Sequence, residues 1–332
     1  MTEPRNILIT GASGFIGSFI VEEALRQGYT VWAGVRSSSS RQYLSDPRIH
    51  FAELDLSDVT HLCEQFKKLN QETGGGGWDY VIHAAGATKA RRRSDFFRVN
   101  TEGTKNLVTA LRQCNMTPKL FVFTSSLSVM GKNTHADMPH PNTSYGESKL
   151  MAEQFLATTK DFPYVILRPT GVYGPRERDY ALMAQSIRRH VDFSVGFRHQ
   201  DITFIYVRDF VSAIFRCVDI AASGNTKNIV EKAYFLTDGQ VYTSRDFSLL
   251  LQQAMHVRHV LRIRCPLFLL WTICALSGTI ARWLGRTTTL NLDKYHILAQ
   301  RDWTCDTLPA QRDLAFHPEW SLARGVEETY AL

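Results

Sequence analysis

The stretch NILITGASGFIG, residues 6–17, constrains the fold more than any other part of the chain. Its apolar, β-branched start predicts a buried strand, and the amphipathic segment after it, which ends at Gly28, predicts a helix. The glycines between them allow a tight turn and a close approach of backbone to phosphate, whose negative charge the helix N-terminus attracts. This order predicts a dinucleotide-binding unit, although the spacing is G-x-x-G-x-x-G instead of G-x-G-x-x-G, and a glycine turn without a ligand is the alternative. The residues expected to contact the pyrophosphate are Gly11, Ser13, Gly14, Phe15, Ile16 and Gly17.

The alternation of strand and helix continues as far as Pro169. Short β-branched runs separated by amphipathic segments are typical of parallel sheets covered by helices, so the predicted fold is α/β, a Rossmann-type doubly wound sheet. After Pro169 the pattern changes to glycine- and proline-marked loops and then helices, which predicts a smaller, mainly helical C-terminal lobe. We expect a Rossmann domain over residues 1–170, a substrate-binding lobe over residues 171–332, and a strand and helix around 203–237 that return to the first domain. The further predicted strands are residues 30–35, 49–54, 80–85, 119–125 and 164–169.

Composition narrows the classes of function. The 332 residues, 44% of them hydrophobic, are enough for a large buried core. The net charge of +6 would suit anionic partners, but only residues 90–98 form a dense basic cluster, so a nucleic-acid partner is not expected. The six cysteines form no C-x-x-C pair and no metal-ligand spacing, which favours reduced thiols in the cytoplasm and predicts no metal site. The apolar strand within the first ten residues argues against a signal peptide there.

The end of the second predicted strand bears on the choice of cofactor. In dinucleotide-binding folds an acidic residue at this point binds the ribose hydroxyls of NAD, whereas a basic residue favours the 2′-phosphate of NADP. Here the strand ends AGVRSSSS, with Arg36 and four serines and no carboxylate. A guanidinium and hydroxyls can both donate to phosphate oxygens, so we expect NADP(H). NAD(H) is the alternative, in which Arg36 is an ordinary exposed arginine.

Other strand ends are expected to meet at the same edge of the sheet, where ligands of such folds bind. After the third predicted strand, an aspartate could reach the adenine of the cofactor. After the fifth, two serines would face the glycine loop. The residues that follow the third, fourth and fifth strands are Asp55 and Leu56, then Ala84, Ala85 and Gly86, then Ser125 and Ser126.

The stretch SYGESKL, residues 144–150, places a phenol and an ammonium on one helix face, because Tyr145 and Lys149 are four residues apart. Ser144 and Glu147 have capping-box spacing, which predicts the helix start. A free tyrosine has a pKa of about 10, and two neighbouring cations, the lysine and an oxidised nicotinamide, would favour its phenolate. Tyr145 could then exchange a proton with a substrate oxygen held by Ser126 while a hydride moves to or from the cofactor. Lys149 would also bind the nicotinamide ribose.

With these motifs in order, the chain resembles the extended short-chain dehydrogenase/reductase family, which includes nucleotide-sugar epimerases and dehydratases, dihydroflavonol reductases and 3β-hydroxysteroid dehydrogenases. The resemblance covers nearly the whole chain and is most specific in TGASGFIG, HAAG, VNTEGT, FTSS, YGESK and LRPTGVYGPRE. It implies a small-molecule substrate and a homodimer. It selects Ser126 over Ser125. The implied catalytic set is Ser126, Tyr145 and Lys149 with a supporting Asn100, and the implied nicotinamide neighbours are Pro169, Gly171 and Val172.

The substrate class is less constrained. Nucleotide-sugar members usually carry an arginine for the diphosphate two residues before a segment like FIYVRDFV, and this chain has Ile202 there. The pattern DITFIYV is closer to the steroid dehydrogenase branch, which favours a lipophilic alcohol or ketone. A nucleotide-sugar epimerase or dehydratase with tightly held NAD is the alternative, since Arg198 or Arg176 could replace the missing arginine. A cofactor-binding regulator without activity is disfavoured, because it would have no need of the serine, tyrosine and lysine.

Residues 265–281 contain no charged side chain over 17 positions and are flanked by arginines. The segment is at the lower limit for a membrane span. Two other interpretations are a buried helix that roofs the substrate pocket and an interfacial membrane contact through residues 265–286, with the arginine heads in water. The sequence therefore predicts a cytoplasmic protein and leaves peripheral membrane association open.

Overall fold

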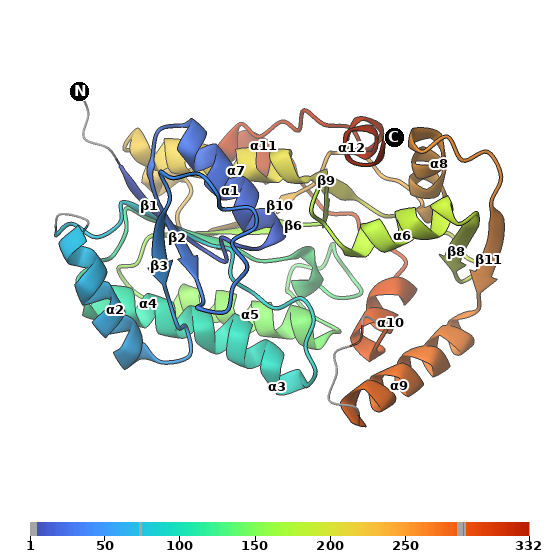
Figure 1. Cartoon of the computed structure of the whole chain (residues 1–332), viewed down its shortest axis with the longest axis horizontal. Helices are drawn as coiled ribbons and strands as arrows, with labels where there is room; N and C mark the ends of the chain where they lie inside the picture. Colours follow the sequence, from blue (N-terminus) through green and yellow to red (C-terminus); the bar gives the residue numbers. More distant parts are fainter. Residues whose placement is uncertain (1–4, 73–74, 284–287, 289, 332) are drawn as a thin grey trace.

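The computed structural model contains a seven-stranded parallel sheet in the order β10-β6-β5-β4-β1-β2-β3 (Figure 1). It describes the chain except for residues 1–4, 73–74, 284–287, 289 and 332. The order reverses between β1 and β4, as in a doubly wound sheet, and the predicted fold class is confirmed. The strands are β1 (Asn6–Thr10), β2 (Thr30–Val35), β3 (His50–Glu53), β4 (Tyr80–His83), β5 (Leu120–Thr124), β6 (Tyr164–Pro169) and β10 (Lys232–Leu236).

Two helical layers cover the sheet, because alternate strand residues point to opposite faces. Ile7 and Ile9 of β1 belong to one buried cluster and Leu8 belongs to the other. One layer consists of α1 (Phe15–Arg26), α7 (Val207–Ala222) and α11 (Leu308–Leu314). The other consists of α2 (Val59–Glu72), α4 (Gly103–Gln113) and α5 (Ser144–Thr158). Three short helices, α3 (Arg93–Phe96), the π-helix η1 (Phe97–Glu102) and the 3₁₀-helix η2 (Leu127–Val129), connect strands to these layers, and η3 (Thr226–Asn228) precedes β10.

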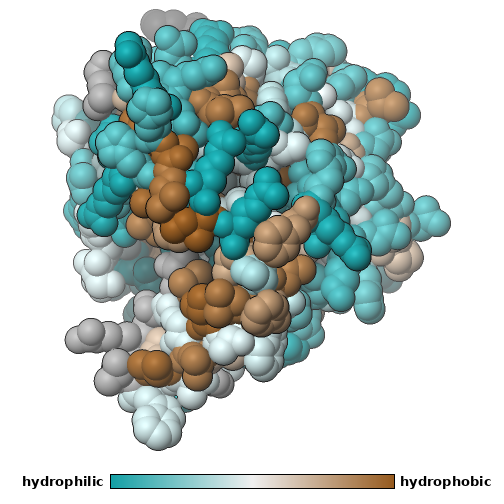
Figure 2. All heavy atoms as spheres, turned by 90° about the vertical axis from the view of Figure 1, so that its right-hand side faces the viewer, coloured by the Kyte–Doolittle hydropathy of each residue, from teal (hydrophilic) through white to brown (hydrophobic). Residues whose placement is uncertain are grey.

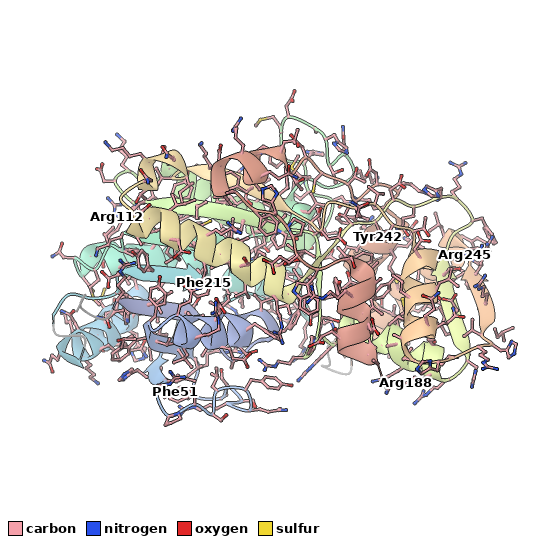
Figure 3. All side chains as sticks on the ribbon, turned by 90° about the horizontal axis from the view of Figure 1, so that it is seen from above. Phe51, Arg112, Arg188, Phe215, Tyr242 and Arg245 are labelled. Carbon is pink, nitrogen blue, oxygen red and sulfur yellow. The ribbon has the colours of Figure 1, made fainter. Side chains whose placement is uncertain are left out.

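The C-terminal lobe has a core of its own, built around the aromatic ring of Phe204. Phe204 stacks on Phe247 with ring centroids 5.0 Å apart. In the view from above, Tyr242, Arg188 and Arg245 lie at this end of the molecule, and Phe51 and Arg112 lie at the sheet end (Figure 3). The elements of this end are two parallel strand pairs, β7 (Gly171–Tyr173) with β9 (Phe204–Tyr206) and β8 (Val191–Val195) with β11 (Leu261–Cys265), and the helices α6 (Asp179–Arg188), α8 (Ser244–Ala254) and α12 (Leu322–Tyr330).

The uncharged segment forms most of α9 (Leu267–Trp283), which packs on α10 (Leu292–Ala299) at the lower right of Figure 1. The expectation of a buried helix is correct for one face only, because Leu270 and Cys274 are buried whereas Phe268 and Trp271 are exposed. Within the described part of the chain, none of the helices combines the length and apolarity needed to cross a bilayer. Arg286, one of the flanking arginines, lies outside the described residues.

The start of α5 differs from the predicted capping box. The N-cap is Thr143, whose Oγ1 accepts a hydrogen bond from the Gly146 backbone N–H at 3.0 Å. Ser144 is the first helical residue, so Ser144 and Glu147 do not form the expected pair. The threonine hydroxyl takes the capping role because it precedes the first helical residue and reaches the third backbone N–H. By contrast, α1 ends as predicted, with Gly28 at φ +82° directly after the C-cap.

Candidate active site

The turn between β1 and α1 lies against the backbone that follows β4. Gly11 has φ +70°, and a Cβ atom on it would lie 2.6 Å from the Ala85 nitrogen. A Cβ on Gly17 would lie 2.1 Å from the Gly11 oxygen, so neither position can hold a larger residue without moving backbone. The Gly14 N–H donates to that same Gly11 oxygen at 2.9 Å, which closes the turn. The turn with Ser13, and the start of α1 with Phe15 and Ile16, thereby adjoin the segment of Ala84 and Ala85, where a pyrophosphate cradle is expected.

Arg36 lies one residue beyond the end of β2, at the same sheet edge. Gly34 pairs with Thr10 of β1, which places the β2 end beside the glycine turn. The Arg36 backbone N–H donates to Ser39 Oγ at 3.1 Å, and its side chain is exposed. The guanidinium is therefore presented to solvent next to the cradle.

Asp55 and Leu56 follow β3 at the neighbouring position. The carboxylate of Asp55 is exposed and accepts a hydrogen bond from the Ser57 N–H at 3.0 Å. Hydrogen bonding to Ser57 lowers the pKa of Asp55, so this side chain carries a charge at neutral pH. Leu56 is partly buried against the core under α2 and α4.

Tyr145 and Ser126 face each other across the site. Tyr145 lies in the first turn of α5, partly buried, and Ser126 precedes η2. Burial raises the pKa of the Tyr145 phenol, and a hydrogen bond with the Ser126 side chain acts in the opposite direction. The phenol is thus protonated near neutrality and close to the serine, an arrangement that can deliver a proton to an oxygen bound beside both groups.

Ser125 has a different environment from Ser126. Its hydroxyl donates to the buried Glu153 carboxylate, which also forms an ion pair with Arg168 at 2.6 Å. Ser126 Oγ instead accepts from the Ser128 N–H at 3.1 Å and faces Tyr145. Ser125 therefore belongs to a buried network, whereas Ser126 is outside it, so Ser126 remains the candidate for the catalytic serine.

Lys149 lies one turn of α5 after Tyr145 and is only 4% exposed. Its Nζ donates to the Thr124 carbonyl at 2.6 Å and lies 4.7 Å from the centre of the Phe123 ring. Burial lowers the pKa of Lys149 to about 8, although the Glu153 carboxylate opposes the change. An ammonium held in this way can donate further hydrogen bonds to a bound group.

Asn100 connects the loop after β4 to α5. It lies in the π-helix η1, a geometry that is frequent at functional sites. Its amide accepts from the Ala87 N–H at 2.7 Å, donates to the Ala87 oxygen at 3.0 Å and donates to Ser148 Oγ at 2.9 Å. A Cβ on Gly86 would lie 3.1 Å from Asn100 Oδ1 and 3.4 Å from Lys149 Nζ. Asn100, Gly86 and Lys149 therefore meet at one point of the sheet edge.

Pro169, Gly171 and Val172 lie at the carboxyl end of β6 and in β7. Pro169 pairs with Leu236 of β10, and the neighbouring Thr170 N–H donates to the Leu236 oxygen at 3.1 Å. This segment shares the sheet edge with the residues above. In the described part of the chain it does not join their hydrogen-bond network.

A side chain that the sequence analysis missed, Asp293 of α10, reaches the start of α5. Its carboxylate accepts from the Ser144 N–H at 3.1 Å and from Ser144 Oγ at 3.3 Å. Nearby, Asp179 of α6 forms ion pairs with both Lys89 and Lys294, which ties the loop after β4 to the C-terminal lobe. No local sequence signal marks these contacts, because they join residues that are about a hundred or more positions apart.

Two of the residues considered for a substrate diphosphate, Arg176 and Ile202, have other contacts in the structure. Arg176 donates to Ser18 Oγ at 2.9 Å and stacks between Phe19 and Tyr43, with its guanidinium carbon 4.3 and 4.5 Å from the two ring centres. It is therefore engaged with α1 and the loop after β2. Ile202 exchanges two backbone hydrogen bonds with Tyr242, at 2.7 and 2.8 Å, and packs on the core of the C-terminal lobe.

Comparison with known proteins identifies a family and finds two kinds of relative, sterol dehydrogenases and nucleotide-sugar epimerases. The sequence model described as the NAD dependent epimerase/dehydratase family matches residues 7–231. The chain is 26% identical over 259 residues to a sterol-4-alpha-carboxylate 3-dehydrogenase (decarboxylating) of Dictyostelium discoideum, covering 73% of this chain and 74% of that protein. It is 27% identical to a UDP-glucose 4-epimerase of Vibrio cholerae, covering 72% and 74%. The solved structure of a Thermotoga maritima UDP-glucose 4-epimerase, 21% identical, shares the fold with a TM-score of 0.74 over 98% of this chain and 97% of that one.

Proposed function

The chain belongs to the NAD dependent epimerase/dehydratase family as an extended short-chain dehydrogenase/reductase, and from this premise we propose that it acts on a lipophilic alcohol or ketone. The substrate would be sterol-like or aromatic, and the cofactor NADP(H). The observation that carries the proposal is the isoleucine at position 202, where nucleotide-sugar members usually have an arginine for the diphosphate.

The proton side of the reaction is assigned to Tyr145 and Ser126. Ser126 holds the substrate oxygen, and Tyr145 gives it a proton in the direction of reduction or takes one in the direction of oxidation. Lys149 stabilises the phenolate that remains after the proton has left, because its ammonium lies one helical turn away.

The residues at the sheet edge fit a dinucleotide. The glycine turn leaves its backbone open where a side chain would otherwise intrude, and the segment of Ala84, Ala85 and Gly86 forms the opposite wall. Gly11, Ser13, Gly14, Phe15, Ile16 and Gly17 would hold the pyrophosphate, Arg36 the 2′-phosphate, and Asp55 with Leu56 the adenine end. Lys149 would hold the nicotinamide ribose, with Pro169, Gly171 and Val172 beside the ring. Bound NADP(H) would supply or accept the hydride.

The environments of two residues, Ile202 and Arg176, support a substrate without a diphosphate. An isoleucine offers a diphosphate neither charge nor a donor, and Ile202 is fixed by its strand-like pairing with Tyr242. Arg176, which could have replaced the arginine, is held by Ser18, Phe19 and Tyr43. A bidentate arginine is worth about 1.5–3 kcal/mol to a phosphate, or roughly tenfold to a hundredfold in affinity.

A nucleotide-sugar epimerase or dehydratase with tightly held NAD is the second candidate. It is favoured by the Vibrio cholerae relative and by the exposure of Arg198, which lies in the loop after β8. Such an enzyme must keep its cofactor through the catalytic cycle. The absorption spectrum of the purified protein separates the candidates, because bound NAD supports the epimerase and free exchange of NADP(H) supports the dehydrogenase.

The experiment that tests the substrate class is calorimetric titration with UDP and dTDP, run beside an NADPH-oxidation screen of sterol-like and aromatic ketones. We expect weak or undetectable nucleotide binding and turnover of at least one hydrophobic cyclic ketone. Micromolar UDP or dTDP binding together with a silent ketone screen would contradict the proposal and favour the epimerase.

A further inference from the structure

The outer face of α9 is apolar and exposed, which is unusual for a helix of a globular protein. Trp283 is 87% exposed, Phe268 75% and Leu276 59%. Figure 2 shows apolar atoms grouped low on this end of the molecule, at the level where α9 lies in Figure 1. We define the α9 face as Phe268, Trp271, Ile273, Leu276, Ile280 and Trp283.

The opposite face of α9 already has its partner. Leu270 and Cys274 are buried, and Gly278 approaches Asn291 at the start of α10 closely enough that a Cβ would lie 3.7 Å from the Asn291 Cβ. The α9 face is therefore not the side that holds the helix to the rest of the lobe. Its apolar character requires another explanation.

Two exposed threonines of α9, Thr272 and Thr279, donate their hydroxyl hydrogen bonds to the backbone of the helix itself. Thr272 Oγ1 donates to the Phe268 oxygen at 2.9 Å, and Thr279 Oγ1 donates to the Ala275 oxygen at 2.8 Å. Both groups are thus satisfied without water, as they would have to be in an apolar medium.

A group of arginines, called here the arginine rim, lies in the segment that leads into α9. Residues 247–292 include several arginines but no aspartate or glutamate. Arg258, Arg262 and Arg264 precede α9 and are exposed, with Asp192 as an ion-pair partner of Arg262 at 3.7 Å. The loop after β8 reaches the start of α9, since a Cβ on Gly196 would lie 3.7 Å from Leu267 Cγ.

We propose that the α9 face and its arginine rim bind the surface of an anionic phospholipid bilayer, with α9 lying in the interface. Apolar side chains, tryptophans and flanking arginines are the combination that such a surface favours. The helix has 17 residues and a length of about 26 Å at 1.5 Å per residue, less than the roughly 30 Å of the hydrocarbon core. It is therefore suited to lying on a membrane.

A second copy of the chain is a poorer occupant of this surface. A two-fold interface would bring the same arginines of both copies together, and no acidic residue of segment 247–292 would compensate their charge. The headgroups of anionic lipids supply that compensation. Through its opposite side α9 is connected to the candidate site, because it packs on α10, whose Asp293 contacts Ser144.

The test is cosedimentation of the full chain with vesicles of phosphatidylcholine mixed with phosphatidylserine, and with vesicles of phosphatidylcholine alone. It needs neither substrate nor cofactor, so its result is independent of the proposed reaction. We expect binding to the anionic vesicles that weakens with salt. Trp271→Gln/Leu276→Gln should abolish it, and Leu308→Gln, which changes an exposed leucine of α11, should leave it unchanged.

A second pair of variants tests the charge. Arg258→Gln/Arg264→Gln should weaken binding by roughly 25-fold, at about fivefold for each arginine near an anionic surface. Arg48→Gln/Arg112→Gln removes the same charge from the sheet end and should have little effect. The proposal would be overturned if the protein failed to bind anionic vesicles or bound neutral vesicles equally well. It would also be overturned if the protein formed a dimer that Trp271→Gln/Leu276→Gln dissociated.

Discussion

At the scale of single residues, sequence spacing located the candidate tyrosine–lysine pair but could not choose between the two serines. Tyr145 and Lys149 are four positions apart in a helical pattern, so their shared face follows from helix geometry. Ser125 and Ser126 both end the same strand, and spacing treats them alike. Only the contact of Ser125 with Glu153, 28 residues later, separates them in the structure. The family resemblance chose Ser126, and the geometry gives a physical reason.

Alanine substitutions of the two serines should have different consequences. Ser126→Ala removes the group assigned to the substrate oxygen and should lower turnover about 100-fold with little change in stability. Ser125→Ala removes a hydrogen bond to a buried carboxylate and should lower the free energy of unfolding by about 1.5–3 kcal/mol, with a smaller effect on turnover. Steady-state kinetics and urea unfolding of both variants check this. A larger loss of turnover in Ser125→Ala would reverse the assignment.

Substitution of Arg36 tests whether the protein prefers NADP(H) to NAD(H). Its exposed guanidinium at the end of β2 should favour the 2′-phosphate, so the wild-type protein should bind NADPH more tightly than NADH. Arg36→Asp should reduce NADPH affinity about tenfold to a hundredfold, as measured by fluorescence titration. Arg41→Asp is the matched control, because Arg41 follows in the same loop but stacks on Phe51 at 4.1 Å. Tighter NADH binding by the wild type, or an equal loss in the control, would refute the role of Arg36.

Lys149 predicts a pH dependence of cofactor binding. Burial lowers its pKa to about 8, so the ammonium is present below that pH and is lost as the pH rises through it. NADPH affinity should therefore be steady near pH 7 and fall above pH 8. Lys149→Arg keeps its charge throughout this range and should show a flat profile, whatever its absolute affinity. Parallel profiles for the two proteins would show that another group is responsible.

At the scale of elements, the strands of the main sheet could be predicted from the sequence, whereas the strand pairs of the C-terminal lobe could not. Short runs of β-branched residues between amphipathic segments predicted β1 to β6. The predicted and observed bounds of β3, β4 and β5 differ by only one or two residues at the strand ends. The pairing of β8 with β11 joins segments about 70 residues apart, and the exposed residues of β11 give it no buried pattern. The start of α5 was misplaced by one residue because Thr143 and Ser144 are both capping residue types, and Ser144 has Glu147 at capping-box spacing.

At the scale of the whole molecule, the site is assembled from both ends of the chain. The glycine turn, the β5 serines and α5 supply the reactive groups, and α10 approaches through Asp293. The glycine turn, the β5 serines and α5 could be found from the sequence, because each is a contiguous motif. The contact of α10 with α5 could not, because it depends on the tertiary arrangement of the C-terminal lobe. The domain boundary near residue 170 and the homodimer implied by the resemblance stay predictions.

The central claim is that this chain moves a hydride between NADP(H) and a lipophilic carbonyl carbon while Tyr145 moves the proton. The most direct measurement incubates the protein with NADPH deuterated at the transferable position and a cyclic ketone, and follows deuterium in the product alcohol by mass spectrometry. The wild-type protein and Tyr29→Phe, which changes a phenol packed against Tyr80 and Phe215, should both place deuterium on the carbinol carbon. Tyr145→Phe should bind NADPH unchanged and transfer deuterium about 10²–10⁴-fold more slowly. Absence of deuterium from every alcohol, or full transfer by Tyr145→Phe, would contradict the account.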